Sequence, residues 1–306
     1  MSFNTYIIIV TYNATPWLDK CLGSIDFSKF KVVVIDNNSK DQTVNHIEKN
    51  FPEVILFKEE KNLGFGKANN KGINYALEQG AEYFFLLNQD AWVEPETLET
   101  LCEVASLNPD YGILSPIHFS GTNNALDYNF SNYIIPSKCK DLYSDIYFQN
   151  YSKTVYELPF VNAAAWLMTK KCVNTVGGFS PSFFHYAEDK NYCQRVAYHK
   201  LKIGVVPTSK ICHDREQSTE NKYYEDPYIL QKQIATLELS NPFYKMSKFR
   251  FFLWSLKTIV RLVINKEFNL RKSISIFKKI YKEIDLETLI NNRELSKNKG
   301  ATFFSQ

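Results

Sequence analysis

The sequence predicts an α/β protein with a mostly parallel central sheet flanked by helices, followed by a C-terminal helical appendage. Between residues 6 and 90, short apolar runs typical of buried strands alternate with segments of helical spacing. Each apolar run ends on polar residues, and short loops join the elements. From about Pro242 the composition changes to basic and aromatic residues. These three observations define the expected architecture.

Composition excludes several classes of protein. A net charge of +3 over 306 residues is too small to indicate a nucleic-acid partner. Six scattered cysteines without a C-x-x-C pair argue against a zinc site or a disulfide scaffold. Residues 6–10 are too short for a signal-peptide core, and no apolar run reaches the roughly 18 residues of a spanning helix. We therefore expect a cytoplasmic protein with reduced thiols.

The first elements follow from short β-branched runs. Residues 6–10 (YIIIV) predict a buried parallel strand that opens into the polar loop 11–13. A helix then begins near Thr15-Pro16 and continues to Ile25. Residues 31–35 (KVVVI) predict the second strand, and after a polar helix through His46 residues 54–57 predict the third.

The next helix and strand complete the N-terminal half. After the glycine-containing loop 62–66 we expect a helix over 67–79, and residues 83–87 (YFFLL) predict a fourth strand that ends on Asn88-Gln89-Asp90. Short loops between alternating strands and helices favour right-handed crossovers and a parallel sheet. Ligands bind beyond the C-terminal strand ends of such sheets. The polar clusters after these strands therefore predict the binding site.

The second half of the chain is less regular. Residues 108–156 are rich in Tyr, Asn and Ser, and we interpret them as irregular strands and loops that cover the site. Order returns at 160–169 and around Glu188-Asp189, and 203–206 predict a short strand that ends in a turn at Pro207. We expect one α/β domain over 1–240, with a first half over about 1–107 and a second half over about 108–240, and a tail over 241–306.

Two motifs in the first half suggest a nucleotide. Asp36, at a strand end, can accept a hydrogen bond from a base imide or a ribose hydroxyl, and it can equally cap the following turn. The glycines of 62–72 (NLGFGKANNKG) allow close approach to a ligand before a helix N-terminus that favours phosphate. An ordinary glycine turn is the alternative. The spacing fits neither a P-loop nor a dinucleotide fingerprint.

Three acidic or histidine positions suggest chemistry. Asp90 follows an apolar strand, where its carboxylate can bridge a divalent metal to a diphosphate or simply end the strand. Glu188-Asp189 open a helical pattern after an aromatic cluster, so one of them can act as general base, or both can favour the helix start. His213 can ligate the metal, with Arg215 as an anion partner, although a lone His is more often structural.

Taken together, these residues resemble the inverting family 2 glycosyltransferases of GT-A fold, in the bacterial rhamnosyltransferase-like branch that builds surface polysaccharides. The resemblance covers residues 5 to 215, in one ordered set of short motifs. Those motifs are Val10-Thr11-Tyr12-Asn13, Asp36-Asn37-Asn38-Ser39, Asn62-x-Gly64-Phe65-Gly66 with Ala68-Asn69-Asn70, Leu87-Asn88-Gln89-Asp90, Asn162-Ala163-Ala164, Gly177-Gly178-Phe179, Glu188-Asp189 with Arg195, and His213.

The resemblance implies a role for each position. It implies that Asp189 is the base that deprotonates the acceptor hydroxyl, with Glu188 as its neighbour, and that Asp90 and His213 hold Mg²⁺ or Mn²⁺. The donor would contact Thr11, Tyr12, Asn13, Asp36, Asn38, Gly64, Asn69, Asn88 and Gln89. The sugar and acceptor pocket would include Asn162, Trp166 and Arg195. The domain over 1–240 would thus be the catalytic domain, with a nucleotide-sugar half over about 1–107 and an acceptor half over about 108–240.

Two positions depart from the family pattern. Asn88 replaces the first acid of the Asp-x-Asp motif, which leaves the metal with fewer protein charges. Asn69 stands where many relatives have Arg, so diphosphate binding would depend more on the metal.

The tail has its own pattern. Over 243–281, aromatic and aliphatic residues interleave with lysine and arginine, which predicts basic amphipathic helices able to lie at an anionic membrane surface. Packing on the catalytic domain or a dimer contact is the alternative. A membrane contact over 243–282 would place the enzyme at the inner face of the cell membrane, near a lipid-linked saccharide acceptor.

Two other functions compete with transfer. A non-catalytic sugar-nucleotide-binding protein would have no need for Glu188-Asp189. A nucleotidyltransferase would carry a basic glycine-rich loop after the first strand, where this chain has Thr11-Tyr12-Asn13-Ala14. The donor implied by the resemblance is dTDP-rhamnose or a UDP-hexose, since both bases present the same imide edge.

Overall fold

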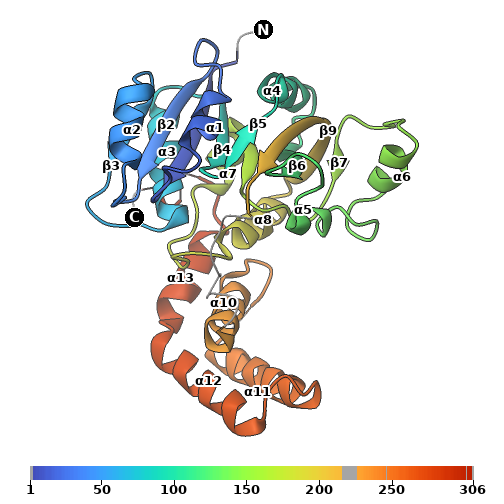
Figure 1. The fold of residues 1–306 in the computed structure, drawn as a ribbon. Coiled ribbons are helices and arrows are strands. Elements are labelled where there is room, and N and C mark those ends of the chain that lie inside the picture. The colour runs from blue at the N-terminus through green and yellow to red at the C-terminus, as the bar shows by residue number, and fades with distance from the viewer. Residues whose placement is uncertain (1–2, 216–225, 246, 301, 305–306) are drawn as a thin grey trace.

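The computed structural model of the chain describes residues 3–215, 226–245, 247–300 and 302–304. A sheet covered by helices forms one end of the molecule, and helices α10 to α13 extend from it as a tail (Figure 1).

The sheet is mixed, and its first half is parallel. Its strand order is β3-β2-β1-β4-β8-β6-β9-β5, with β7 paired to β9. Strands β1 to β4 are parallel neighbours, as their short apolar runs predict. The strand bounds are β1 (Thr5–Thr11), β2 (Lys31–Asp36), β3 (Ile55–Lys58), β4 (Tyr83–Asn88), β5 (Ala91–Val93), β6 (Tyr111–Ser120), β7 (Tyr156–Glu157), β8 (Ala165–Thr169) and β9 (Lys202–His213).

A single antiparallel strand determines how the two halves of the sheet are aligned. Strand β8 lies between β4 and β6 and runs antiparallel to both, so β6 has the same direction as β4. Strand β9 is parallel to β6. The C-terminal ends of β1, β2, β4, β6 and β9 therefore all meet at one edge of the sheet, where α/β proteins bind ligands.

Each face of the sheet is covered by its own helices. Ile7 and Ile9 of β1 pack on the face covered by α1 (Leu18–Gly23), α2 (Thr43–Asn50) and α4 (Thr97–Leu107). Ile8, which points the other way because side chains alternate along a strand, packs with α3 (Phe65–Glu78), α7 (Lys170–Val176) and α8 (Glu188–Tyr198). The fold is the α/β arrangement that the sequence predicts.

Two expectations for the second half were wrong. Residues 108–156 are not wholly irregular, because β6 is a ten-residue strand in the middle of the sheet, before α5 (Tyr128–Ser131) and α6 (Leu142–Tyr147). Its Tyr, Ser, Pro and His residues concealed a strand whose core side chains are nevertheless buried. Pro207 does not end a strand either: β9 continues to His213, and a register shift against β6 accommodates the proline.

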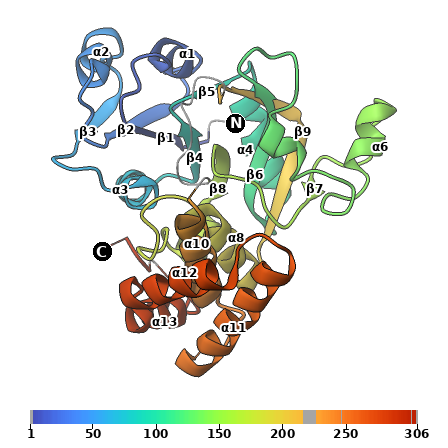
Figure 2. The same ribbon diagram turned by 60° about the horizontal axis from the view of Figure 1, so that its bottom comes forward.

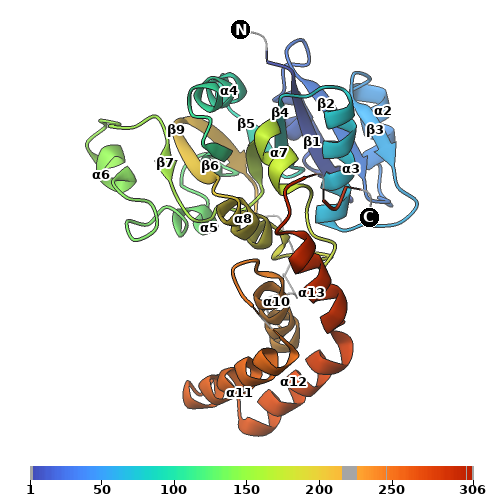
Figure 3. The ribbon, with the colours of Figure 1, turned by 180° about the vertical axis from the view of Figure 1, so that it is seen from behind.

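The tail consists of four packed helices. The helices are α10 (Pro227–Ser240), α11 (Lys248–Ile264), α12 (Leu270–Glu283) and α13 (Leu286–Leu295), and Figures 2 and 3 show their arrangement. Leu239, Phe251, Ile276 and Leu289, one from each helix, belong to a single buried cluster. The cluster includes residues of α10, which ends at Ser240. The sequence-based boundary between the α/β domain and the tail, at 240/241, therefore lies after a helix that packs with the tail; the boundary stays a prediction. Among the described helices, none is long and apolar enough to cross a bilayer.

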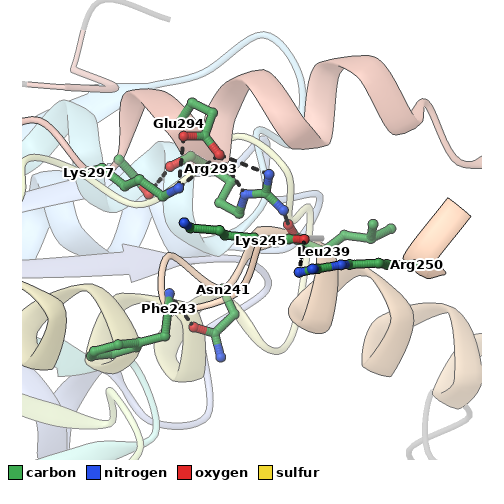
Figure 4. A network of polar contacts seen from close by, with 9 residues as sticks. Leu239, Asn241, Phe243, Lys245, Arg250, Arg293, Glu294 and Lys297 are labelled. Atoms are coloured by element: carbon green, nitrogen blue, oxygen red, sulfur yellow. Dashed lines mark hydrogen bonds and ion pairs between the residues drawn. The ribbon is translucent and has the colours of Figure 1, made fainter. Parts of the chain in front are cut away.

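Polar contacts connect the tail helices (Figure 4). Arg293 of α13 donates to the Leu239 carbonyl of α10 at 3.5 Å and pairs with Glu294 at 2.8 Å. Arg250, at the start of α11, donates to the Lys245 carbonyl at 3.0 Å. The Arg293 contact joins α13 to the end of α10, and the Arg250 contact joins the start of α11 to the segment that precedes it.

The last described residues return to the sheet end of the molecule. The Thr302 carbonyl accepts a hydrogen bond from the Gly178 amide at 2.8 Å, and the Phe303 carbonyl accepts one from Asn70 at 3.2 Å. The Phe303 side chain is buried. The tail is therefore attached to the sheet domain at both of its ends.

Candidate active site

Two adjoining cavities lie at the sheet edge where the parallel strands end. The larger cavity, of 720 Å³, contains Asp90 and His213, and the smaller one, of 220 Å³, contains Glu188 and Asp189. The two share six lining residues: Phe65, Asn88, Asn129, His185, Tyr186 and Arg215. The candidate metal ligands and the candidate base thus lie in separate chambers with a common wall.

Asp90 and His213 are brought together by strand pairing. Asp90 precedes β5, whose first residue Ala91 pairs with His213 at the end of β9, and the Asp214 amide donates to the Asp90 carbonyl at 2.8 Å. His213 Nε2 lies 3.3 Å from Asp90 Oδ1. The antiparallel pairing of β5 with the end of β9 therefore brings together two residues that are 123 positions apart in sequence.

Charge stabilises the ionised forms of this pair. Burial alone raises the pKa of the Asp90 carboxyl, but the charges of His213 and Arg215 outweigh burial and hold that pKa below its usual value. Burial likewise lowers the pKa of His213, and the carboxylates of Asp90 and Asp127 outweigh it and raise that pKa. The chamber therefore combines a carboxylate that is ionised at neutral pH with a histidine whose protonated form is stabilised by two neighbouring carboxylates.

The donor set fits a divalent cation. Two ligands at right angles on an octahedral ion with bonds of about 2.1 Å lie about 3 Å apart, close to the 3.3 Å between Asp90 Oδ1 and His213 Nε2. Within the described residues there is no cluster of three His, Cys, Asp or Glu side chains able to hold a metal. The protein would thus supply two ligands, and phosphate oxygens and waters the rest.

A second carboxylate lies on the far side of His213. Asp127 Oδ2 is 3.4 Å from His213 Nδ1 and accepts a 2.5 Å hydrogen bond from Arg215 Nε. The Asp127 side chain is buried, and although burial opposes ionisation, His213 and Arg215 hold the pKa of Asp127 well below its usual range. Sequence analysis did not identify Asp127, because it lies in the segment interpreted as an irregular cover.

The candidate base lies at the start of α8. Glu188 is buried and Asp189 half-buried, and Asp189 Oδ1 accepts the Lys190 amide at 2.7 Å. Burial raises the pKa of Asp189, and burial together with the Asp189 charge raises that of Glu188. Glu188 Oε2 has no hydrogen-bond partner within the described part of the chain.

The backbone before the base is strained. Tyr186 and Ala187 have φ of 65° and 70°, in the left-handed region that is unfavourable for residues other than glycine. Two such residues in succession are typical of functional sites, where the surrounding packing compensates for the strain. Here they turn the chain so that Glu188 and Asp189 face the smaller cavity.

Several predicted donor residues line the larger cavity. Tyr12, Gly64, Asn88 and Gln89 are among its walls. The Tyr12 amide donates to Gln89 Oε1 at 2.7 Å and Gln89 Nε2 donates to the Tyr12 carbonyl at 3.2 Å, so the strand ends of β1 and β4 are joined. The Tyr12 side chain is 47% exposed, which leaves its ring available to stack on a base.

Four predicted donor residues at the ends of β1 and β2 do not line the cavity: Thr11, Asn13, Asp36 and Asn38. Asp36 is buried and accepts from Thr11 Oγ1 at 2.9 Å and from the Ser39 amide at 2.9 Å. Asn13 accepts from the Lys40 amide, and Asn38 donates to the Glu60 carbonyl, each at 2.8 Å. The structure thus uses Asp36 to fix the turn, the alternative that the sequence left open.

Three further predicted site residues lie outside both cavities. Asn69 is buried in α3 and donates to the Phe65 carbonyl at 3.0 Å. Trp166 is buried in β8 and stacks on Phe179. Arg195 is fully buried, donates to the Val176 and Gly178 carbonyls, and its guanidinium lies over the Phe303 ring. The prediction that Trp166 and Arg195 belong to the sugar pocket was wrong, because both pack in the core; Asn162 does line the smaller cavity.

The cavities also include residues that sequence analysis did not identify. Helix α10 contributes Leu230, Ile234 and Leu237 to the smaller cavity. Their spacing of four and three residues is that of one helix face, a signal visible in the sequence. The other unidentified lining residues are Trp17, Asn129, Tyr133, Phe160, Phe184, His185, Tyr186, Ala187, Lys190 and Gln233.

Comparison with known proteins assigns a family to this arrangement. The family model "Glycosyl transferase family 2" matches residues 6–177. The chain is 24% identical over 238 residues to the N-acetylglucosaminyl-diphospho-decaprenol L-rhamnosyltransferase of Mycobacterium tuberculosis, covering 70% of this chain and 76% of the relative. It is 27% identical over 221 residues to the dTDP-rhamnosyl transferase RfbF of Shigella flexneri, covering 70% of each.

Solved structures share the fold. The crystal structure of S. aureus TarS residues 1–349 superposes with a TM-score of 0.54 at 17% identity, covering 81% of this chain and 68% of TarS. The same protein in complex with UDP superposes with a TM-score of 0.53 at 17% identity, covering 96% and 81%.

Proposed function

This chain belongs to glycosyl transferase family 2 and is a glycosyltransferase, and from that premise we propose which donor, metal and acceptor it uses. The proposed reaction moves rhamnose from dTDP-rhamnose, or a hexose from a UDP-sugar, to a hydroxyl of a lipid-linked saccharide. The names of the two relatives, a decaprenol-linked rhamnosyltransferase and a dTDP-rhamnosyl transferase, support this choice of substrates.

One observation carries the assignment of roles. Asp90 and His213 lie in one chamber, Glu188 and Asp189 lie in the next, and Asn88 and Arg215 belong to the wall between them. A donor whose diphosphate occupies the larger cavity would present its sugar at that wall. An acceptor in the smaller cavity would then meet the sugar from the side opposite the leaving group.

The proposed mechanism is a single displacement with inversion. Asp189 takes the proton of the acceptor hydroxyl, the acceptor oxygen forms the new bond to the anomeric carbon, and the bond from that carbon to the diphosphate oxygen breaks. The anomeric carbon passes through an oxocarbenium-like state, as in glycoside hydrolysis. The raised pKa of Asp189 suits a base, because proton transfer is most effective when the pKa of the base approaches the working pH.

Asp90 and His213 would hold Mg²⁺ or Mn²⁺, which when bound neutralises charge on the departing nucleoside diphosphate. Arg215, which borders both cavities, adds positive charge at the same wall. Tyr12 would provide a stacking surface for the base.

The assignment of donor and metal can be tested without knowing the acceptor. Thermal shift is measured with dTDP-rhamnose, UDP-glucose and UDP-N-acetylglucosamine, each with Mn²⁺, Mg²⁺ or EDTA. We expect stabilisation by a dTDP or UDP compound that EDTA removes and that Asp90→Asn weakens. Equal shifts with and without EDTA would contradict the metal, and the absence of any shift would contradict the donor site.

We further propose that the tail rests on an anionic membrane surface. Along one side of α11, exposed apolar residues recur at helical spacing: Phe249, Phe252, Leu253, Leu256, Val260 and Ile264. The opposite side packs into the tail core through Phe251 and Leu262. Helix α11 carries four basic and no acidic residues, and each basic residue near an anionic surface contributes about 1 kcal/mol.

Flotation with vesicles tests this surface. Deletion of the tail is unsuitable, because Thr302 and Phe303 bond to the sheet domain. The variant with Phe252→Ser and Leu256→Ser should lose at least tenfold in binding to phosphatidylglycerol vesicles, whereas Leu107→Ser, at a 79% exposed site of α4, should bind as wild type. Binding that equals wild type in the double variant, or none by wild type itself, would overturn the proposal.

A further inference from the structure

We propose that Asp127 is a positioning residue that keeps the proton of His213 on Nδ1 and so presents the unprotonated Nε2 to the metal. This inference rests on the proposed metal site of Asp90 and His213. It concerns a residue of the chain that no sequence motif identified.

His213 is enclosed by two carboxylates, one on each ring nitrogen. Nε2 faces Asp90 Oδ1 at 3.3 Å, on the side of the larger cavity, and Nδ1 faces Asp127 Oδ2 at 3.4 Å. The side chains of His213 and Asp127 are each 1% exposed. Water is therefore not available to Nδ1, and Asp127 is the carboxylate that faces it.

Asp127 is itself firmly held. Its Oδ1 accepts the Phe130 amide at 2.8 Å as the N-cap of α5, and its Oδ2 accepts Arg215 Nε at 2.5 Å. One oxygen is thus directed at the backbone and the other at the space shared by Arg215 and His213. An ionised carboxylate only accepts hydrogen bonds, so a group that faces Oδ2 is favourable only as a donor.

This arrangement selects one form of the ring. A neutral imidazole carries its single proton on one nitrogen, and the hydrogen bond made there decides which nitrogen is left as a ligand. With the proton on Nδ1 facing Asp127, the lone pair of Nε2 faces Asp90 and the cavity. The order carboxylate, histidine, metal recurs in protein metal sites, where the outer carboxylate fixes the ring.

The 3.4 Å contact is longer than an ordinary hydrogen bond, and Nδ1 makes no hydrogen bond of good geometry among the described residues. Contacts in catalytic sites are often long before the ligands bind. A purely structural role is the competing explanation, in which Asp127 caps α5 and neutralises Arg215 without influence on His213. The two explanations differ in what an asparagine at this position does.

Asp127→Asn separates them. Asparagine caps a helix as well as aspartate does, so its oxygen can stay on the Phe130 amide. Its NH₂ group then faces Nδ1 and Arg215, both of which are donors when His213 has the form proposed here. The ring can accept from this NH₂ only with its proton moved to Nε2, which blocks the metal ligand. An outer carboxylate of this kind typically changes metal affinity by about 10- to 100-fold.

The measurement is the affinity for Mn²⁺, taken by electron paramagnetic resonance of the free ion at saturating dTDP or UDP. We expect Asp127→Asn to weaken Mn²⁺ binding at least about tenfold, and Asp127→Ser, which keeps the cap without a misplaced donor, to weaken it less. The matched control is Asp145→Asn, since Asp145 accepts from the Ser152 amide at 3.0 Å in the same region but lines neither cavity. Wild-type affinity in Asp127→Asn would overturn the inference.

Two further samples keep the outcomes distinct. If His213→Gln and Asp90→Asn bind Mn²⁺ as wild type, the proposed metal site fails; if they do not and Asp127→Asn does, only the role of Asp127 fails. If Asp127→Asn does not fold, ¹⁵N spectra of histidine-labelled wild type with Mg²⁺ and nucleoside diphosphate test the proposal instead. The protein has five histidines, few enough for the His213 signals to be assigned. We expect the His213 proton on Nδ1, and a proton on Nε2 would refute the proposal.

Discussion

Gly64→Ala tests the contact between Gly64, in the loop that precedes α3, and Phe184, in the loop that precedes Glu188 and Asp189. Gly64 has φ 78° and ψ 171°, a conformation almost confined to glycine, and forcing another residue into it costs about 1–3 kcal/mol. A Cβ at this position would also lie 2.1 Å from the Phe184 carbonyl oxygen, where real Cβ contacts are at least 3.0 Å. Backbone must therefore move, and overpacking of this kind adds about 1–3 kcal/mol.

The combined cost is about 2 kcal/mol or more, which lowers Tm by about 4 °C or more for a protein of this size class. The loop that has to move carries Phe184, His185 and Tyr186, which line the donor cavity. We therefore expect the affinity for the nucleotide donor to fall together with Tm.

Gly23→Ala is the matched control. Gly23 is exposed at the end of α1, has no left-handed φ, and a Cβ there would meet nothing within 4 Å. Alanine is favoured over glycine in a helix by about 0.5–1 kcal/mol, so this variant should melt at or slightly above the wild-type Tm. The two variants are compared by calorimetry and by titration with dTDP or UDP. A Gly64→Ala protein with wild-type Tm and donor affinity would refute the reasoning.

Three more predictions follow from the site. Asp189→Asn should lose at least about 10²-fold in kcat, while nucleotide binding measured by calorimetry is retained; a near-wild-type rate would exclude Asp189 as the base. Because the base must be ionised and burial raises the pKa of Asp189, kcat/KM should fall on acidification at a pH above the usual aspartate range; an acidic limb that lies within the usual aspartate range would contradict a buried base. Arg195→Met should destabilise the fold, seen as a lower Tm, because the Val176 and Gly178 carbonyls lose their donor; a raised donor KM at wild-type Tm would instead restore the sugar-pocket role.

The parallel half of the fold could be predicted because its signals are local. Residues 6–10 and 31–35 are β-branched runs ended by polar residues. Strand β1 extends one residue beyond each predicted end, and β2 extends one residue beyond its predicted C-terminal end. Strand β6 was missed because a proline, a histidine and serines interrupt its apolar pattern, while its neighbours β8 and β9, which bury those residues, are distant in sequence.

The sequence predicted the acidic residues that line the cavities, but it did not predict the buried polar residues around them. Asp90, Glu188 and Asp189 line the cavities as expected, since each follows or begins an element that ends at the sheet edge; their catalytic roles stay predictions. Arg195 was predicted to line the sugar pocket because its helix begins with two site residues, but that helix also has a buried side. From the sequence alone, an arginine that binds a ligand cannot be distinguished from one that donates to backbone carbonyls. Asp127 could not be found, because its partners lie 86 and 88 positions away.

The return of the chain end to the sheet domain has a consequence for how the protein forms in the cell. Asn70 contacts Phe179 and, through the same side-chain nitrogen, the carbonyl of Phe303, which is 233 residues further along. On a ribosome the first strands can pair early, since domains generally fold from the N-terminus during synthesis. The Phe303 contact has to wait until residue 303 has left the exit tunnel. Until then Asn70 lacks one of its two carbonyl partners and the buried Arg195 guanidinium lacks the ring that lies over it, so this part of the α3–α8 side of the domain reaches its final packing last.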